Sequence, residues 1–271
     1  DPEHVDVPAE GLLSEEYAEE RRSRMTPDSN FSDTPEPGNP RGFGEEGGAG
    51  TETAADGETG GNGKAREDGR YYPDTSYLAV VDGEGNAVSM TPSDFPMTPM
   101  VPGTGLTLGN RMTQFRLDPD HPSSLEPGKR PLITPHAVMV SKDGDFHMSF
   151  GTPGGDTQTQ ALVQVFLNTI VFGMGIQEAI EAPRFVSANF PNSFAPHEYS
   201  PGTVEIERSL YDEVGDGLEE KGYELDVYDD WADGDRFGGV CAVKRAEGGG
   251  LVGGADPRLE SWAAGDSSRY F

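Results

Sequence analysis

The sequence predicts an α/β protein in which antiparallel hairpins carry helices on their outer side. A strongly apolar stretch at 157–172 has the length and spacing of a buried helix. Because strands and such helices bury their apolar faces together, one folded unit is expected over 75–271. Two pairs of β-rich runs, each joined by a turn that contains glycine, supply the hairpins: 75–82 with 87–91, and 137–140 with 146–150.

The residues before position 75 divide into a short helix and an acidic linker. A helix is predicted over 12–25, with Ser14 as its N-cap, acidic residues in its first turn and arginines near its end. It resembles the last helix of an upstream domain, so a longer protein is expected. The stretch 38–74 holds eleven glycines and little that is apolar, and it cannot offset its ordering entropy. The predicted division is therefore 1–37, a disordered linker at 38–74, and 75–271.

After the first hairpin, loops alternate with regular elements. The stretch 92–115 is rich in Pro, Gly and Met and predicts mostly loop, with a short strand at 106–108. A glycine turn at 151–156 ends the last strand of the second hairpin. No role can be assigned to 186–197. The remaining predictions are a loop at 119–131, helices at 176–182 and 210–221, and strands at 203–207, 225–228 and 239–243.

The charge of the chain excludes two classes of partner. Its formal net charge is −28, and Arg outnumbers Lys fifteen to five. Nucleic acid and anionic membrane surfaces would be repelled. An acidic, lysine-poor composition fits a halophilic protein, and it favours the cytoplasm unless an export signal lies upstream. No apolar run approaches the ~20 residues of a membrane span.

Several familiar kinds of site find no support in the sequence. Cys241, the single cysteine, lies in an apolar run and is predicted to be a core residue. His121, His136 and His147 lack the spacing of zinc ligands. The chain also lacks a G-x-S-x-G nucleophile elbow and a phosphate-binding glycine motif. The residues therefore give no support to a zinc site or to a nucleotide phosphate site.

Thr75 stands where the acidic linker meets the first hairpin. If the bond after Asp74 were cut, Thr75 would carry a free α-amine, whose reference pKa is about 7.7 to 8.0. Such an amine can activate the threonine hydroxyl as a nucleophile. The alternative is that Thr75 merely begins a strand, and its position alone does not decide between the two.

The glycine turn at 151–156 also has two interpretations. Backbone amides at a glycine turn that enters a helix form an anion site. Gly154 and Gly155 could direct two amides at a developing oxyanion, worth about 2.7 to 4 kcal/mol per donor. The same residues could equally make a tight turn between a strand and a helix.

Six motifs in order resemble the small subunit of the γ-glutamyltransferases, and the likeness covers 75 to about 264. The residues from Val5 to Ala18 resemble the end of that family's large subunit. The motifs lie at 75–82, 85–89, 128–131, 151–155, 178–185 and 254–258.

The resemblance implies an N-terminal-nucleophile hydrolase with a four-layer αββα sandwich, of which this chain encodes only part. It implies that the precursor cuts itself before Thr75, whose hydroxyl then attacks a γ-glutamyl amide as in glutathione hydrolysis or transfer. Gly154 and Gly155 match the oxyanion hole, and the resemblance implies no metal or organic cofactor. Ser93 matches a second hydroxyl beside the nucleophile, with Thr91 as the alternative. The implied partner is the chain's own large subunit, which in the family supplies an arginine for the substrate carboxylate.

Departures from the family pattern affect the expected substrate. The substrate-binding positions are occupied here by Arg111, Gln114 and Thr134, and Phe95 replaces an asparagine. A neutral amide at 114 in place of a carboxylate forfeits a contact to the substrate ammonium of about 1.5 to 3 kcal/mol. The stretch 115–130 is too short for the lid loop that several family members have. In this it resembles the branch of the family without a lid, which includes glutaryl (cephalosporin-type) acylases. A glutaryl-amide acylase and a non-catalytic relative therefore stay open as alternatives.

Overall fold

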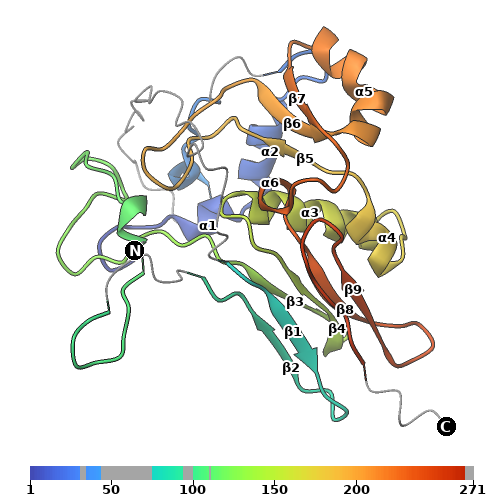
Figure 1. Ribbon diagram of the computed structural model, residues 1–271. Coiled ribbons are helices and arrows are strands. Elements are labelled where there is room, and N and C mark those ends of the chain that lie inside the picture. The colour runs from blue at the N-terminus through green and yellow to red at the C-terminus, as the bar shows by residue number, and fades with distance from the viewer. Residues whose placement is uncertain (31–34, 44–74, 94–99, 110, 266–271) are drawn as a thin grey trace.

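The computed structural model describes residues 1–30, 35–43, 75–93, 100–109 and 111–265 (Figure 1). A two-stranded hairpin packs on one face of a four-stranded antiparallel sheet, and helices α3 and α4 cover the other face. The hairpin strands are β1 (Leu78–Val81) and β2 (Ala87–Met90). The sheet has the order β3-β4-β8-β9, with β3 Ala137–Lys142, β4 Asp145–Gly151, β8 Cys241–Arg245 and β9 Leu251–Ala255. Both predicted hairpins are thereby confirmed, whereas β9 was not predicted.

The first hairpin is held by its turn and by polar contacts to the sheet below. In the turn, the Asp82 carboxylate accepts from the backbone amides of Glu84 and Asn86. The Tyr77 hydroxyl bonds the Ser149 hydroxyl of β4 at 3.0 Å, and burial raises the pKa of this phenol. A Cβ on Gly151 would lie 2.3 Å from the Tyr77 ring, so only glycine permits this approach. The hairpin therefore has a fixed position over the sheet.

The main core lies between the four-stranded sheet and two helices, α3 (Thr157–Ile170) and α4 (Ile176–Glu181). The rings of Phe150 and Phe166 stack with centroids 6.2 Å apart. Both helices were predicted, and each ends one or two residues earlier than expected. The buried apolar residues of this core are Met148, Phe150, Ala161, Leu162, Val165, Ile176, Ala179, Ile180, Val240 and Ala242.

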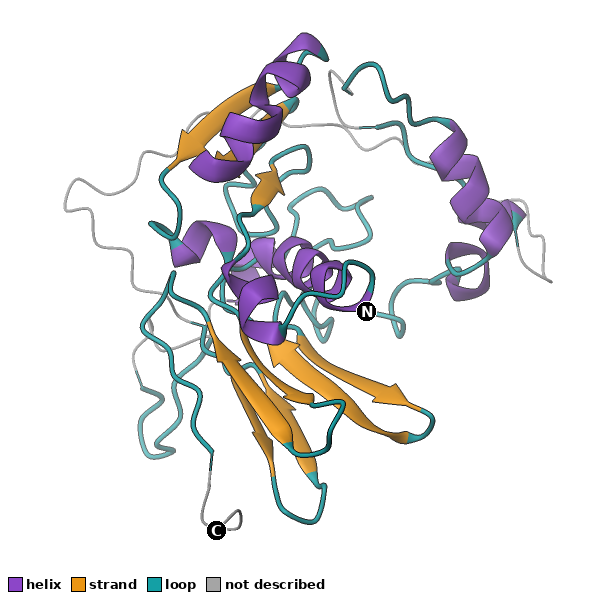
Figure 2. Cartoon of the chain, turned by 90° about the vertical axis from the view of Figure 1, so that its right-hand side faces the viewer, coloured by secondary structure: helices purple, strands orange, loops and turns teal. Residues whose placement is uncertain are grey.

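A smaller three-stranded sheet stands on the far side of α3 and α4 from the hairpin (Figures 1 and 2). Its order is β5 (Phe185–Ser187), β6 (Thr203–Glu207) and β7 (Glu224–Tyr228). Helix α5 (Arg208–Glu220) connects β6 to β7, which pair in parallel. The sequence analysis predicted antiparallel hairpins and no parallel pair. The parallel pair forms because helix α5 returns the chain so that β7 runs in the same direction as β6.

The N-terminal segment differs from its prediction. Instead of one helix over 12–25 there are two, α1 (Ala9–Leu12) and α2 (Glu15–Ser23), because the Ser14 hydroxyl caps the second by accepting from the Tyr17 amide at 3.1 Å. Ser14 is thus the N-cap, as predicted.

The first residues of the predicted linker, 38–43, belong to the described part of the chain. They include the 3-10 turn η1 (Pro40–Gly42), and the Phe43 ring lies 5.4 Å from that of Tyr17. The remainder, 44–74, lies outside the described residues, and the division of the chain at 37 and 74 stays a prediction.

The long loops contain a few local contacts. In place of a strand at 106–108, only Thr107 forms a bridge, with Met100. A 3-10 turn, η2 (Arg111–Gln114), was not predicted. In the loop at 119–131, the buried Lys129 ammonium donates to Glu126 at 2.7 Å, which lowers the pKa of that carboxyl to about 2. No helix among the described residues is long and apolar enough to cross a membrane.

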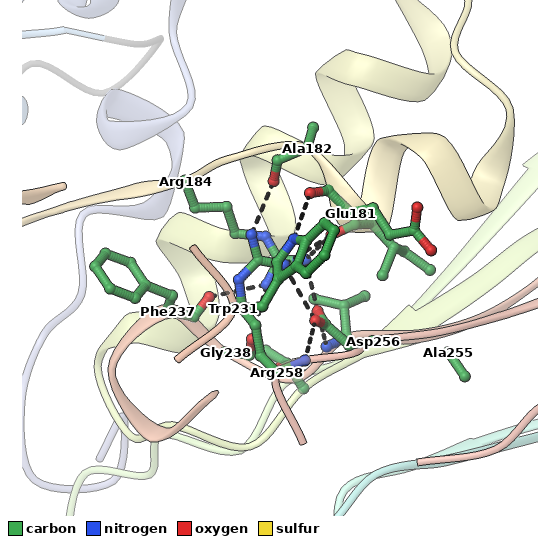
Figure 3. A network of polar contacts seen from close by, with 12 residues as sticks. Glu181, Ala182, Arg184, Trp231, Phe237, Gly238, Ala255, Asp256 and Arg258 are labelled. Carbon is green, nitrogen blue, oxygen red and sulfur yellow. Dashed lines mark hydrogen bonds and ion pairs between the residues drawn. The ribbon is translucent and has the colours of Figure 1, made fainter. Parts of the chain in front are cut away.

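A buried network of four charged side chains joins the sheets to α4 (Figure 3). Arg184 donates to Asp256 at 2.7 Å, and Arg258 donates to Asp256 and Glu207. The remaining guanidinium hydrogen bonds reach backbone carbonyls of Ile180, Ala182, Phe237 and Gly238. Two of the six motifs, at 178–185 and 254–258, thus meet in the interior and hold the fold together.

The acidic composition predicts that salt stabilises the protein. Raising NaCl from 0.1 to 2 M should raise the melting temperature by several degrees, because screening lengths fall from about 10 Å to 3 Å or less. Differential scanning fluorimetry measures this effect. Exchanging the exposed Asp212, Glu213 and Asp216 of α5 for amides should weaken the dependence. An unchanged melting temperature across this range would contradict the prediction.

Candidate active site

Thr75 and Ser93 lie beside each other at the base of the first hairpin. Their hydroxyl oxygens are 2.8 Å apart, and Thr75 is only 8 % exposed. The pairing arises because the chain on either side of the hairpin returns to the same place: the Ser76 amide donates to the Pro92 carbonyl at 2.9 Å. A hairpin thus brings two hydroxyls eighteen residues apart into direct contact.

Of the two candidates for the second hydroxyl, the structure places Ser93 against Thr75. The alternative, Thr91, donates its hydroxyl to the backbone carbonyl of His136 at 2.7 Å. Thr91 therefore connects the hairpin to the segment before β3. Asp74 and Phe95 lie outside the described residues.

Arg111 connects this hydroxyl pair to the predicted substrate-binding residues. Its Nη2 donates to the Ser93 hydroxyl at 2.7 Å, and its Nη1 donates to Thr134 at 2.9 Å and to Gln114 Oε1 at 3.2 Å. Because Ser93 accepts from Arg111, its own hydroxyl hydrogen can point at Thr75 Oγ1. Hydrogen bonds thus connect five residues that the sequence predicted separately: Thr75, Ser93, Arg111, Gln114 and Thr134.

Gln114 is buried rather than presented at the surface. It is 1 % exposed, and its Nε2 donates to the Ser193 hydroxyl at 3.1 Å. Ser193 donates in turn, through its amide and its hydroxyl, to the two oxygens of Asp156, both at 2.7 Å. Since Asp156 immediately precedes α3, the turn η2 is connected to the start of that helix.

The glycine turn next to Asp156 has a backbone that favours glycine. Gly154 has φ = 120° and Gly155 has φ = 54°, values in the left-handed region. A Cβ on Gly154 would also lie 3.2 Å from the Asp235 carbonyl oxygen. The turn leads directly into α3, whose first amides carry partial positive charge. This arrangement suits an oxyanion hole and equally a tight turn, so the two interpretations of the sequence both fit it.

The sequence missed two residues of this site, Ser193 and Phe194. The Phe194 ring lies 5.3 Å from the Arg111 guanidinium carbon, within the range of a cation–π contact. Both residues lie in the loop that follows β5, within the stretch 186–197, which has no motif of its own. The Ala195 amide donates to the Thr113 carbonyl at 2.8 Å, which pairs this loop with η2. No sequence signal could have indicated a contact across this separation.

The cysteine and the histidines give no sign of a second nucleophile or of a metal site in the described residues. Cys241 is partly buried on β8, and burial raises the pKa of its thiol, which disfavours a thiolate nucleophile. His136 Nδ1 lies against the Thr134 carbonyl oxygen at 2.5 Å, and His121 and His147 lie elsewhere. Within the described part of the chain, no three His, Cys, Asp or Glu side chains are grouped as metal ligands would be.

A comparison with protein families decides the identity of the fold. The family model described as gamma-glutamyltranspeptidase matches residues 1–266. The chain belongs to this family. Its fold is accordingly that of an N-terminal-nucleophile hydrolase, an αββα sandwich of which the chain provides part, and the sequence resemblance is confirmed.

Individual relatives of this gamma-glutamyltranspeptidase family member have several named activities. The glutathione hydrolase-like YwrD proenzyme of Bacillus subtilis is 35 % identical over 71 % of this chain and 36 % of its own length. The oxamate amidohydrolase proenzyme of Klebsiella pneumoniae is 31 % identical over 71 % of this chain and 35 % of its own. The crystal structure of the cephalosporin acylase from Bacillus halodurans matches with a TM-score of 0.69, at 30 % identity over 98 % of this chain and 41 % of that one. The chain thus spans about a third of the length of the curated relatives it matches.

Proposed function

We propose that this protein is a self-processing amidohydrolase whose nucleophile is Thr75. The hydroxyl of Thr75 attacks an amide carbonyl, the carbon–nitrogen bond breaks, and the α-amine of Thr75 passes the proton to the leaving amine. Water then hydrolyses the acyl ester on Thr75, or an amino acid or peptide amine takes the acyl group. Gly154 and Gly155 supply the amides for the oxyanion, and Ser93 assists the nucleophile.

The single observation that carries this proposal is the direct contact between the Thr75 and Ser93 hydroxyls. Two hydroxyls brought together by a hairpin, with the Arg111 guanidinium donating to the second, favour an activated oxygen over a residue that merely begins a strand. Relatives named as proenzymes support cleavage of the chain before Thr75. A non-catalytic relative would have no need of this constellation.

The partner in the proposal is the protein's own large subunit, to which the residues before Thr75 belong. The face of the first hairpin that points away from the sheet is apolar and exposed, with Val80 57 % exposed. Cross-strand pairs on this face, Leu78 with Met90 and Val80 with Val88, form a flat apolar surface. Such a surface fits a second sheet, as the αββα sandwich requires. Without that partner the hairpin face would promote aggregation.

The proposed substrates are γ-glutamyl amides or glutaryl amides, and one measurement decides which of the two the protein prefers. A γ-glutamyl donor carries an α-ammonium, which Gln114 cannot pair as a carboxylate would. We therefore expect the complete protein to hydrolyse glutaryl p-nitroanilide with a kcat/KM about tenfold above that for γ-glutamyl p-nitroanilide, because an α-ammonium that loses water and finds no carboxylate costs about 1 to 3 kcal/mol. Equal or higher efficiency on the γ-glutamyl compound would make the protein a glutathione hydrolase or transferase instead. If the complete protein hydrolyses neither compound, that result would favour a non-catalytic relative.

A further inference from the structure

Residues 115–133 form a loop, here called the strap, whose two ends meet at the candidate active site. Gln114, just before the strap, accepts from Arg111 Nη1 at 3.2 Å, and Thr134, just after it, accepts from the same nitrogen at 2.9 Å. Both residues are buried. Nη2 of the same guanidinium donates to the Ser93 hydroxyl at 2.7 Å. A shift of the strap would therefore move the groups that hold Arg111.

The strap is a compact loop with hydrogen bonds of its own. The Arg116 amide donates to the Ser123 carbonyl at 2.9 Å, and the Leu125 amide donates to the Arg116 carbonyl at 3.0 Å. The buried Lys129 ammonium donates to the Ser124 hydroxyl at 3.0 Å. Because such a loop is packed by its own residues, a contact made at one place constrains both of its ends.

The N-terminal segment contacts the strap close to its second end (Figure 1). The Asp1 carboxylate accepts from Arg130 three times: from the backbone amide at 2.8 Å, from Nε at 3.2 Å and from Nη2 at 2.8 Å. Glu3 accepts from the same guanidinium at 3.0 Å, and His4 Nδ1 lies 3.6 Å from a carboxylate oxygen of Glu126. Three residues at the start of the chain thus hold the strap.

The contact between Asp1 and Arg130 is stronger than an ordinary surface ion pair. The Asp1 side chain is 1 % exposed, so its carboxylate would remain buried without donors if Arg130 moved away. Asp1 fixes the main chain of Arg130 as well as its side chain. Pro131 follows, and its ring restricts the backbone on the way to Thr134. The hold on Arg130 therefore limits where the second end of the strap can lie.

The N-terminal segment is also held at its other end. The Asn30 amide donates to the Lys221 carbonyl at 3.0 Å, and Asn30 Nδ2 donates to the Gly222 carbonyl at 2.6 Å. These carbonyls lie just past α5, where a helix leaves acceptors without partners. Gly222 has φ = 88°, and a Cβ on it would lie 3.4 Å from Asn30 Oδ1. Residues 1–30 are thus fixed both at α5 and at the strap.

We propose that residues 1–30 position the strap for substrate binding, and that Arg130 is the positioning residue through which they do so. While Asp1 holds Arg130, the ends of the strap keep Arg111 in place beside the hydroxyl pair. When this contact is lost, the strap adopts other positions, and only the fraction in the held position binds substrate. KM then rises by the inverse of that fraction.

The proposal gives the N-terminal segment a role after the proposed cleavage. If the chain is cut before Thr75, the contact between Asp1 and Arg130 joins two separate subunits. The site then binds substrate well only while the end of the large subunit is in place. The effect on KM rests on the proposed function, whereas the hold on the strap does not.

The kinetic test uses the complete protein and whichever p-nitroanilide it hydrolyses. Arg130→Gln and Asp1→Asn should each raise KM about tenfold, as loss of a charge-assisted hydrogen bond predicts, with kcat changed less than about twofold. The double variant should resemble either single variant, because both remove the same contact. Arg130→Lys keeps a charged donor and should restore most of the wild-type KM. The control is Arg22→Gln, which breaks an exposed ion pair within α2 and should leave KM unchanged.

Hydrogen exchange tests the strap without any turnover. In Arg130→Gln and Asp1→Asn, the amides that donate within the strap should exchange about tenfold faster than in wild type, while those of α3 stay unchanged. Arg22→Gln should behave as wild type. The amides to follow are those of Arg116, Ser124, Leu125 and Lys129.

The two measurements separate this inference from the proposed reaction. Faster exchange in a protein that hydrolyses no anilide would refute the reaction and leave the hold on the strap standing. Unchanged exchange in both Arg130→Gln and Asp1→Asn would overturn the inference even in an active enzyme. Faster exchange with an unchanged KM, or an equal rise of KM in Arg22→Gln, would refute the positioning role of Arg130.

Discussion

Replacing Thr75 by alanine should leave the chain uncut before residue 75 and abolish turnover of acyl anilides. Removing a nucleophile from a catalytic group that acts as a unit lowers kcat by about four orders of magnitude or more. Intact mass and N-terminal sequencing of the complete protein, after incubation in molar salt, measure the cleavage. In wild type we expect a new N-terminus at Thr75, and in Thr75→Ala we expect only the precursor.

Two matched variants test whether the effect belongs to the Thr75 hydroxyl. Thr75→Ser keeps a hydroxyl and should still be cut, more slowly. Ser93→Ala removes the partner that lies 2.8 Å from Thr75 Oγ1 and should slow cleavage about fivefold, as a net hydrogen bond of about 1 kcal/mol predicts. Cleavage at residue 75 in Thr75→Ala, or an uncut wild-type chain, would contradict the role proposed for Thr75.

The local elements could be predicted because their signals are local. The alternation of apolar and polar residues in 137–150 predicts a hairpin, and the apolar run at 157–172 predicts a helix. The structure has both. β5 and β9 were missed for a different reason. β5 has only three residues, and β9 contains two adjacent glycines, which weaken a strand pattern. Their positions come from pairing with β6 and β8, which no local pattern reports.

The candidate site could be predicted only where a motif carried it. Thr75 and the glycine turn lie in motifs that resemble the family, Ser93 was placed by counting from the first of these motifs, and the structure brings Thr75 and Ser93 together. Arg111 and Gln114 were also predicted as site residues, but the difference in their burial was not. That Gln114 is buried and Arg111 is accessible depends on Ser193 and Asp156, which lie far away in the sequence. Burial of this kind is a property of packing, and composition does not reveal it.

The buried charges beneath the glycine turn should dominate stability. Arg184, Arg258, Asp256 and Glu207 have side chains at most 1 % exposed, and their charges balance. Asp256→Asn keeps the shape but leaves two guanidinium groups with a single carboxylate. Removing one partner of a buried pair costs about 3 to 5 kcal/mol. We therefore expect Asp256→Asn to lower the free energy of unfolding by that amount, measured by urea titration in molar salt.

The same substitution should also reduce activity, because the network supports the turn. Arg184 donates to the carbonyls of Phe237 and Gly238, at the end of α6 (Gly234–Phe237). Gly238 packs so closely that a Cβ on it would lie 2.8 Å from the Thr152 hydroxyl, two residues before Gly154. The control is Glu19→Gln, which breaks an ion pair to Arg22 with both side chains about 70 % exposed and should cost less than about 1 kcal/mol. Equal effects of the two substitutions would mean that the buried charges are not coupled, and that the glycine turn is held by backbone packing alone.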